Sequence, residues 1–145
     1  MRVILDTNIF ISYLLAKREG GTIRRIVEGC LLRPEVLLIV PNELKEEILS
    51  VWARKPALQK AIPLQRLESV LLQIQTIAEV PAPIEEILQY NRDPKDDYLI
   101  AYGLFLQADY LVSGDEDLTV LKQIKILQII SPVEFLMVLE PESSV

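Results

Sequence analysis

Short runs of consecutive apolar residues alternate along the chain with longer segments in which apolar residues recur every three or four positions. The runs at residues 3–5, 36–40 and 110–112 have the length and continuity of buried parallel strands. Helical spacing is clearest after Pro63, where the apolar positions are Leu64, Leu67, Val70, Leu71 and Ile74. This alternation predicts a three-layer α/β/α fold with a mainly parallel sheet of about five strands.

Turn and capping residues set the limits of the remaining predicted elements. Thr7 or Asn8 can cap a helix over residues 9–15, and Thr22 can cap the next one. The other predicted helices are residues 41–54, two pieces after Pro56 and Pro63, residues 84–90, a helix that Asp93 and Pro94 start, a short helix after Asp117 and a C-terminal helix from Ser131 and Pro132. The other predicted strands are a weak one at residues 76–80 and one at residues 124–129.

The length of 145 residues predicts a single domain over residues 1–140, followed by a flexible tail at residues 141–145. Cys30 is the only cysteine, so no internal disulfide can form and a reducing compartment is favoured. The N-terminus lacks the pattern of a signal peptide, and the apolar run at residues 126–139 is too short to cross a bilayer. We therefore expect a cytoplasmic protein with no membrane partner.

The absence of histidine narrows the possible chemistry. Ser-His-Asp and Cys-His catalysis, histidine acid–base chemistry and histidine-ligated zinc are all excluded. The chain has 21 acidic and 15 basic residues, with a net charge of −6. Oxygen-only sites suit Mg²⁺ or Mn²⁺. The acidic balance argues against an extended nucleic-acid-binding surface, but it permits an enzyme that cleaves a phosphodiester at a metal site.

Four acids fall where a parallel sheet could bring them together. Asp6 ends the first strand, Glu47 interrupts the inward face of its helix, and Asp97 heads an apolar helical stripe. Asp115 follows a buried strand; either Asp115 or Asp117 can cap the next helix, which explains one of these acids but not both. Taken singly, each acid also has an ordinary explanation as a cap, turn or surface residue.

Neighbouring polar residues are better explained locally. Asp93 and Asp96 fit a helix cap and a first turn, and Ser113 is as easily a turn residue as a functional hydroxyl. Glu43 lies in a first helical turn and Glu46 points away from the apolar face.

Four carboxylates brought together repel strongly unless a divalent metal compensates them, and such a metal can orient a phosphodiester and activate water.

Four blocks of sequence resemble the PIN domain, most closely the bacterial and archaeal PIN proteins classed as toxins of type II toxin–antitoxin pairs. The blocks, in chain order, are Val3-Ile4-Leu5-Asp6-Thr7-Asn8, Glu47-Ile48, Asp96-Asp97-Tyr98-Leu99-Ile100-Ala101 and Leu111-Val112-Ser113-Gly114-Asp115-Glu116-Asp117-Leu118. The resemblance covers nearly the whole chain. It departs from the family at Pro41, where relatives usually have serine or threonine, and this change should affect a helix cap rather than the site.

The resemblance implies a Mg²⁺- or Mn²⁺-dependent endoribonuclease. It assigns the acidic metal site to Asp6, Glu47, Asp97 and Asp115, with Asp117 as a fifth acid. It also matches Asn8 and Ser113 to positions that hydrogen-bond around the cluster. A homodimer and a small antitoxin partner are further implications.

Three other functions remain open. Asp6 could be the nucleophile of a phosphotransferase or phosphatase, although such enzymes commonly carry a second aspartate two residues on, where this chain has Asn8. The chain could instead be a non-catalytic PIN-like interaction module, or a housekeeping RNA-processing nuclease. Basic residues after the first strand could guide an RNA backbone, but a solvated helix surface explains them better: Lys17, Arg18, Arg24 and Arg25.

Overall fold

The structure is a computed structural model that describes residues 1–16, 20–84 and 97–141, with only the backbone of Asp97. The described helices are α1 (Thr7–Leu15), α2 (Thr22–Leu32), α3 (Asn42–Arg54), α4 (Pro56–Ala61), α5 (Leu64–Ile77), α6 (Asp97–Phe105), α7 (Glu116–Thr119) and α8 (Pro132–Leu139). The described strands are β1 (Arg2–Leu5), β2 (Leu37–Leu38), β3 (Tyr110–Val112), β4 (Gln123–Ile124) and β5 (Leu127–Ile130).

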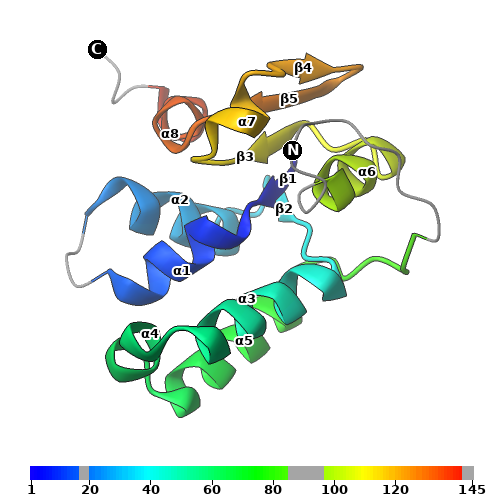
Figure 1. The fold of residues 1–145 in the computed structure, drawn as a ribbon. Helices are drawn as coiled ribbons and strands as arrows, with labels where there is room; N and C mark the ends of the chain where they lie inside the picture. Colours follow the sequence, from blue (N-terminus) through cyan, green and yellow to red (C-terminus); the bar gives the residue numbers. More distant parts are fainter. Residues whose placement is uncertain (17–19, 85–96, 142–145) are drawn as a thin grey trace.

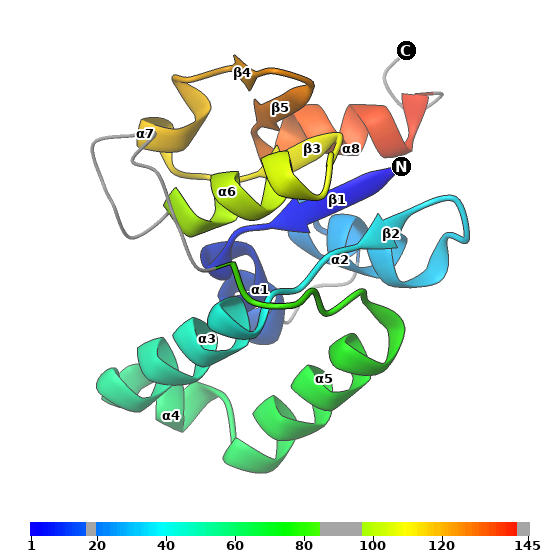
Figure 2. The same ribbon diagram turned by 90° about the vertical axis from the view of Figure 1, so that its right-hand side faces the viewer.

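The strands form one five-stranded sheet in the order β2-β1-β3-β5-β4. All neighbouring pairs are parallel except β4 with β5, which is antiparallel. Helices α2 and α8 lie on one side of the sheet and α6 on the other, while α3, α4 and α5 extend beyond the β2 side (Figures 1 and 2). The predicted α/β/α fold with a mainly parallel sheet is confirmed.

Small residues allow the helices to pack closely on both faces. A Cβ atom on Gly103 of α6 would lie 2.9 Å from Leu127 of β5, and one on Gly29 of α2 would lie 3.0 Å from Leu139 of α8. The strands between them are buried, as expected for a parallel sheet covered on both faces.

The register of the sheet aligns the carboxyl ends of three strands. Leu5 pairs with Val112, and Val112 pairs with Ile130. The Asp6 N–H donates to Val112 O at 3.0 Å, and the Ser113 N–H donates to Ile130 O at 3.0 Å. The residues that follow β1 and β3 are therefore neighbours at one edge of the sheet, where open α/β folds bind ligands.

Two predicted helix caps are wrong. Helix α1 starts at Thr7, and its N-cap is Asp6 rather than Thr7 or Asn8, because the Asp6 carboxylate accepts from the Thr7 N–H. Helix α2 has Gly21 as its N-cap, and Thr22 is its first helical residue.

Three predicted strands also differ from the structure. The strand expected at residues 36–40 is reduced to the two residues of β2, and the one expected at residues 76–80 to a single bridge between Ile39 and Glu79, because α5 continues to Ile77. The strand expected at residues 124–129 is a hairpin: Lys125 adopts a φ of 53°, which ends β4 before β5 begins. The helix predicted at residues 84–90 lies almost wholly outside the described residues. The helix predicted from Asp93 is described from Asp97 onward, where it forms α6, and its predicted cap lies outside the described ranges.

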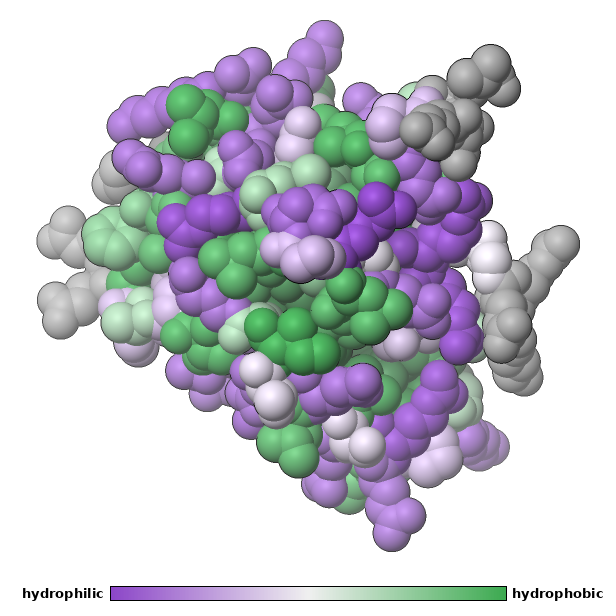
Figure 3. All heavy atoms as spheres, turned by 180° about the vertical axis from the view of Figure 1, so that it is seen from behind, coloured by the Kyte–Doolittle hydropathy of each residue, from purple (hydrophilic) through white to green (hydrophobic). Residues whose placement is uncertain are grey.

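The surface mixes charged and apolar residues. Figure 3 shows hydrophobic side chains gathered near the middle of the face seen from behind, with hydrophilic ones around them. Within the described ranges, no helix combines the length and apolar character needed to cross a bilayer.

Candidate active site

Asp6 is the buried carboxylate at the centre of the candidate site, with only 3% of its surface exposed. It follows β1 directly and caps α1, so its position is set by both elements. Its Oδ1 accepts from the Thr7 N–H at 2.6 Å, and its Oδ2 accepts from the Ser113 hydroxyl at 2.7 Å. Both carboxylate oxygens are therefore oriented by protein donors.

Hydrogen bonds continue from Asp6 along the end of β3. The fully buried Ser113 Oγ accepts from the Asp115 N–H at 3.0 Å while its hydroxyl donates to Asp6. Asp115 Oδ1 in turn accepts from the Asp117 N–H at 2.9 Å and caps α7. Helix α7 therefore begins at Glu116, and of the two candidate caps the structure identifies Asp115. Ser113 therefore links the Asp6 carboxylate, at the end of β1, to the backbone of Asp115, after β3.

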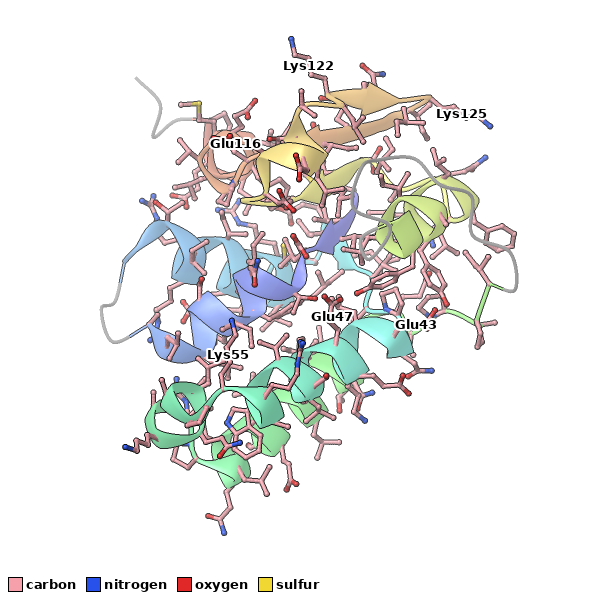
Figure 4. All side chains as sticks on the ribbon, in the orientation of Figure 1. Glu43, Glu47, Lys55, Glu116, Lys122 and Lys125 are labelled. Atoms are coloured by element: carbon pink, nitrogen blue, oxygen red, sulfur yellow. The ribbon has the colours of Figure 1, made fainter. Side chains whose placement is uncertain are left out.

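Glu47 approaches the same region from α3. Its half-buried carboxylate accepts a hydrogen bond from the Tyr98 hydroxyl on α6. One turn earlier on α3, Glu43 Oε2 accepts from the Tyr102 hydroxyl at 2.5 Å. Figure 4 shows Glu43 and Glu47 projecting from α3 toward the rest of the domain. Two tyrosines one turn apart on α6 therefore bind two glutamates one turn apart on α3.

The carboxylates act on one another electrostatically. Burial raises the pKa of Asp6, and the negative charges of Glu47 and Asp115 raise it further, against hydrogen bonds from Ser113 and Thr7 that lower it. Burial also raises the pKa of Tyr98 strongly, with added contributions from its hydrogen bond to Glu47 and from nearby charge. Tyr98 is consequently a neutral hydroxyl within an acidic environment.

The carboxylate ligands at this site suit a hard divalent cation. Asp6, Glu47 and Asp115 offer only oxygen ligands, and no described lysine or arginine forms an ion pair with any of the three. Among the described side chains, no three acids are close enough together to hold one ion as they stand. The Asp97 side chain lies outside that set, and only its backbone is placed, at the start of α6.

The other predicted residues have varied positions. Asn8 is exposed and makes no side-chain hydrogen bond within the described part of the chain, whereas Asp117 is half-buried beside Asp115. Of the predicted guiding cations, Arg24 pairs with Glu28 at 2.9 Å and Arg25 pairs with Glu140. Residues 17 and 18, like residues 93 and 96, lie outside the described ranges.

The sequence interpretation did not assign a role to Tyr98 or Tyr102. Their spacing of four residues matches that of Glu43 and Glu47, which was the available signal. Nothing in the sequence singled out the buried hydroxyl of Thr7. Its Oγ1 has no partner in hydrogen-bond geometry among the described residues, although it is close enough to Tyr98 to lower the pKa of that tyrosine.

A family profile described as the PIN domain matches residues 2–117, which include every predicted site residue. No curated protein matched the chain.

Proposed function

The chain belongs to the PIN-domain family, a metal-dependent nuclease fold, and from this we propose that it is a Mg²⁺- or Mn²⁺-dependent endoribonuclease. The reaction class is hydrolysis of phosphodiester bonds in RNA. The proposal extends the family assignment to a particular substrate class and to particular metals.

One observation carries the proposal: Asp6 is buried beside the negative charges of Glu47 and Asp115. No described cationic side chain compensates these acids. A buried carboxylate close to like charges is costly, and a bound divalent cation would offset the repulsion. Burial and the nearby charges of Glu47 and Asp115 raise the pKa of Asp6, which agrees with this cost.

The site residues have distinct proposed roles. Asp6, Glu47, Asp97 and Asp115 would hold the metal, with Asp117 as a further acid. Ser113 would orient Asp6 through the 2.7 Å bond, and Asn8, in the first turn of α1, would hydrogen-bond around the acidic cluster. A bound Mg²⁺ or Mn²⁺ would supply Lewis-acid chemistry, activating water and stabilising the leaving oxygen. No nucleophilic side chain is then required.

The RNA backbone would meet basic residues on the α3–α4–α5 side of the domain. Residues 54–66 contain no acid, and their basic residues are Arg54, Lys55, Lys60 and Arg66. None of these four forms an ion pair with a described residue, in contrast to Arg24 and Arg25. Arg54 lies two helical turns after Glu47 on α3, and Lys55 follows at the end of that helix (Figure 4).

The proposed biological role is that of a toxin in a type II toxin–antitoxin pair, acting in the cytoplasm as a homodimer and silenced by a small antitoxin. The sequence resemblance to PIN toxins supports this role. A small open reading frame next to the gene, whose product binds the chain and blocks cleavage, would distinguish a toxin from a housekeeping RNA-processing nuclease.

The decisive experiment is cleavage of defined single-stranded RNAs with Mg²⁺, Mn²⁺ or EDTA, comparing wild type with Asp6→Asn. Glu46→Gln, on the exposed side of α3, is the matched control. We expect metal-dependent cleavage by wild type and Glu46→Gln only. A wild-type protein that neither binds Mn²⁺ nor cleaves RNA would overturn the proposal in favour of an interaction module. Trapping of a covalent aspartyl-phosphate would overturn it in favour of a phosphotransferase.

A further inference from the structure

Glu47 differs from the other described site acids in how it is held. Asp6 and Asp115 have short side chains that accept backbone N–H groups from their own helix starts. Glu47 lies in the middle of α3, where its longer side chain has no free backbone donor. Among the described residues, the Tyr98 hydroxyl is its only hydrogen-bond donor. The orientation of the Glu47 carboxylate therefore depends on a side chain from another helix.

Tyr98 is well placed for that task. Its hydroxyl donates to Glu47 Oε2 and lies within reach of the Asp6 charge and the Thr7 side chain. A neutral donor at this point offsets part of the repulsion between Glu47 and Asp6 without adding a competing positive charge. It engages one carboxylate oxygen, which leaves Oε1 available to a cation.

The same contact links two segments that carry predicted ligands. Tyr98 directly follows Asp97 at the start of α6, so its bond to Glu47 connects the first turn of α6 to α3. Partners that orient metal-binding carboxylates are known to affect metal affinity about 10- to 100-fold.

Tyr102 and Glu43 form a built-in comparison pair. The Tyr102 hydroxyl donates to Glu43 at 2.5 Å and also accepts from the Ile84 N–H at 3.2 Å. The charge of Glu47, but not that of Glu43, raises the pKa of Asp6. The two pairs share the same chemistry and the same two helices, and only Tyr98–Glu47 faces the buried acid.

We propose that Tyr98 is a positioning residue that holds Glu47 for metal binding through its hydroxyl group, whereas Tyr102 serves the packing of α6 against α3. This inference rests on the proposed metal-dependent function. It predicts that two substitutions of the same kind, one helical turn apart, have different effects on metal affinity.

The test compares Tyr98→Phe with Tyr102→Phe, each of which keeps the ring and removes one hydroxyl. Mn²⁺ affinity is measured by calorimetric titration, and thermal unfolding is measured in EDTA. We expect Tyr98→Phe to weaken Mn²⁺ binding about 10-fold or more, while Tyr102→Phe stays within about twofold of wild type. RNA cleavage by Tyr98→Phe should recover when Mn²⁺ is raised to saturation, which a merely structural defect would not show.

A double-mutant cycle with Glu47→Gln tests whether Tyr98 acts through Glu47. In the Glu47→Gln background, Tyr98→Phe should cause little further loss of Mn²⁺ affinity. Equal affinities of Tyr98→Phe and wild type, or fully additive losses in the cycle, would overturn the positioning role alone. A Tyr98→Phe protein that stays unfolded even at high Mn²⁺, while Tyr102→Phe folds, would overturn it in favour of a core role. Failure of wild type itself to bind Mn²⁺ would overturn the proposed function.

Discussion

The two sides of the candidate site are built in different ways. On the strand side, Asp6, Ser113 and Asp115 follow the ends of β1 and β3 and are connected by bonds of 2.6 to 3.0 Å that include backbone N–H groups. On the helix side, Glu43 and Glu47 depend on tyrosine hydroxyls from α6.

The strand side of the site should be rigid, whereas the helix side can adjust. Backbone donors at strand ends are fixed by the register of the sheet, so the strand side can move only if the sheet changes. The helix side can move whenever α3 shifts relative to α6, because its contacts join side chains of two separate helices. We therefore expect changes on the strand side to have the larger effects on function.

The largest effect is expected from Asp6→Asn. This substitution removes the buried charge at the centre of the strand side, so Mn²⁺ affinity and RNA cleavage should each fall at least about 100-fold, beyond the range for residues that merely support ligands. Mn²⁺ titration and single-turnover cleavage measure the two losses. Retention of wild-type metal affinity would show that Asp6 acts only as the cap of α1.

Glu47→Gln against Glu43→Gln tests the helix side by itself. Glu47→Gln should lower Mn²⁺ affinity, because Glu47 faces Asp6. Glu43→Gln should leave metal affinity unchanged and reduce the free energy of unfolding by about 1 kcal/mol, through a weaker bond from Tyr102. Calorimetry and denaturant unfolding separate the two effects. Equal loss of metal affinity in both variants would remove the distinction between the two glutamates.

Ser113→Ala breaks the connection between the two strand ends. The buried hydroxyl serves Asp6 and the Asp115 N–H, so its loss should cost about 1–3 kcal/mol of unfolding free energy. Mn²⁺ affinity should fall about 10-fold. Ser69→Ala, on the exposed surface of α5, is the control for both measurements. Unchanged metal affinity would restrict Ser113 to a turn role.

The pH dependence of stability in EDTA tests the electrostatics of Asp6. Its pKa is raised in the folded protein above the ordinary value of 3.8, so its contribution to stability is present below pH 3.8 and is lost as pH rises through the raised pKa. Asp6→Asn should abolish this loss of stability with rising pH. Saturating Mn²⁺ should oppose the loss in wild type, because the metal favours the ionised form of Asp6. Urea unfolding across this pH range provides the measurement. A larger decline of stability with pH in Asp6→Asn than in wild type would contradict the assigned burial and repulsion.

The smallest effect is expected from two basic residues, Lys55 at the end of α3 and Lys60 in α4. Lys55→Gln combined with Lys60→Gln should raise the KM for RNA a few-fold. The slope of log K for RNA binding against log salt concentration should become shallower by about 0.7 per lost phosphate contact. Lys122→Gln combined with Lys125→Gln, at the β4–β5 hairpin, is the matched control because Figure 4 shows both lysines far from Glu47. Equal KM values for the two double variants would exclude this path for the RNA.

The strand-side acids could be placed from the sequence because their signals are local. Asp6 directly follows one short, continuous apolar run, and Asp115 comes three residues after the end of another. Such runs are typical of buried parallel strands, whose carboxyl ends share one edge of the sheet. The cap of α1 could not be assigned in the same way, since Asp6, Thr7 and Asn8 are all good cap residues. Only the backbone at the end of β1 selected Asp6.

The sequence by itself determined the α/β/α class and the placement of acids at strand ends and on an inward helix face. These follow from periodicity and residue type, which act over a few residues. Only the tertiary structure decided that Tyr98 meets Glu47, that Ser113 bridges two strand ends, and that Arg25 pairs with Glu140. Such contacts depend on the packing of elements far apart in the chain, and no local pattern encodes the distance or angle between them.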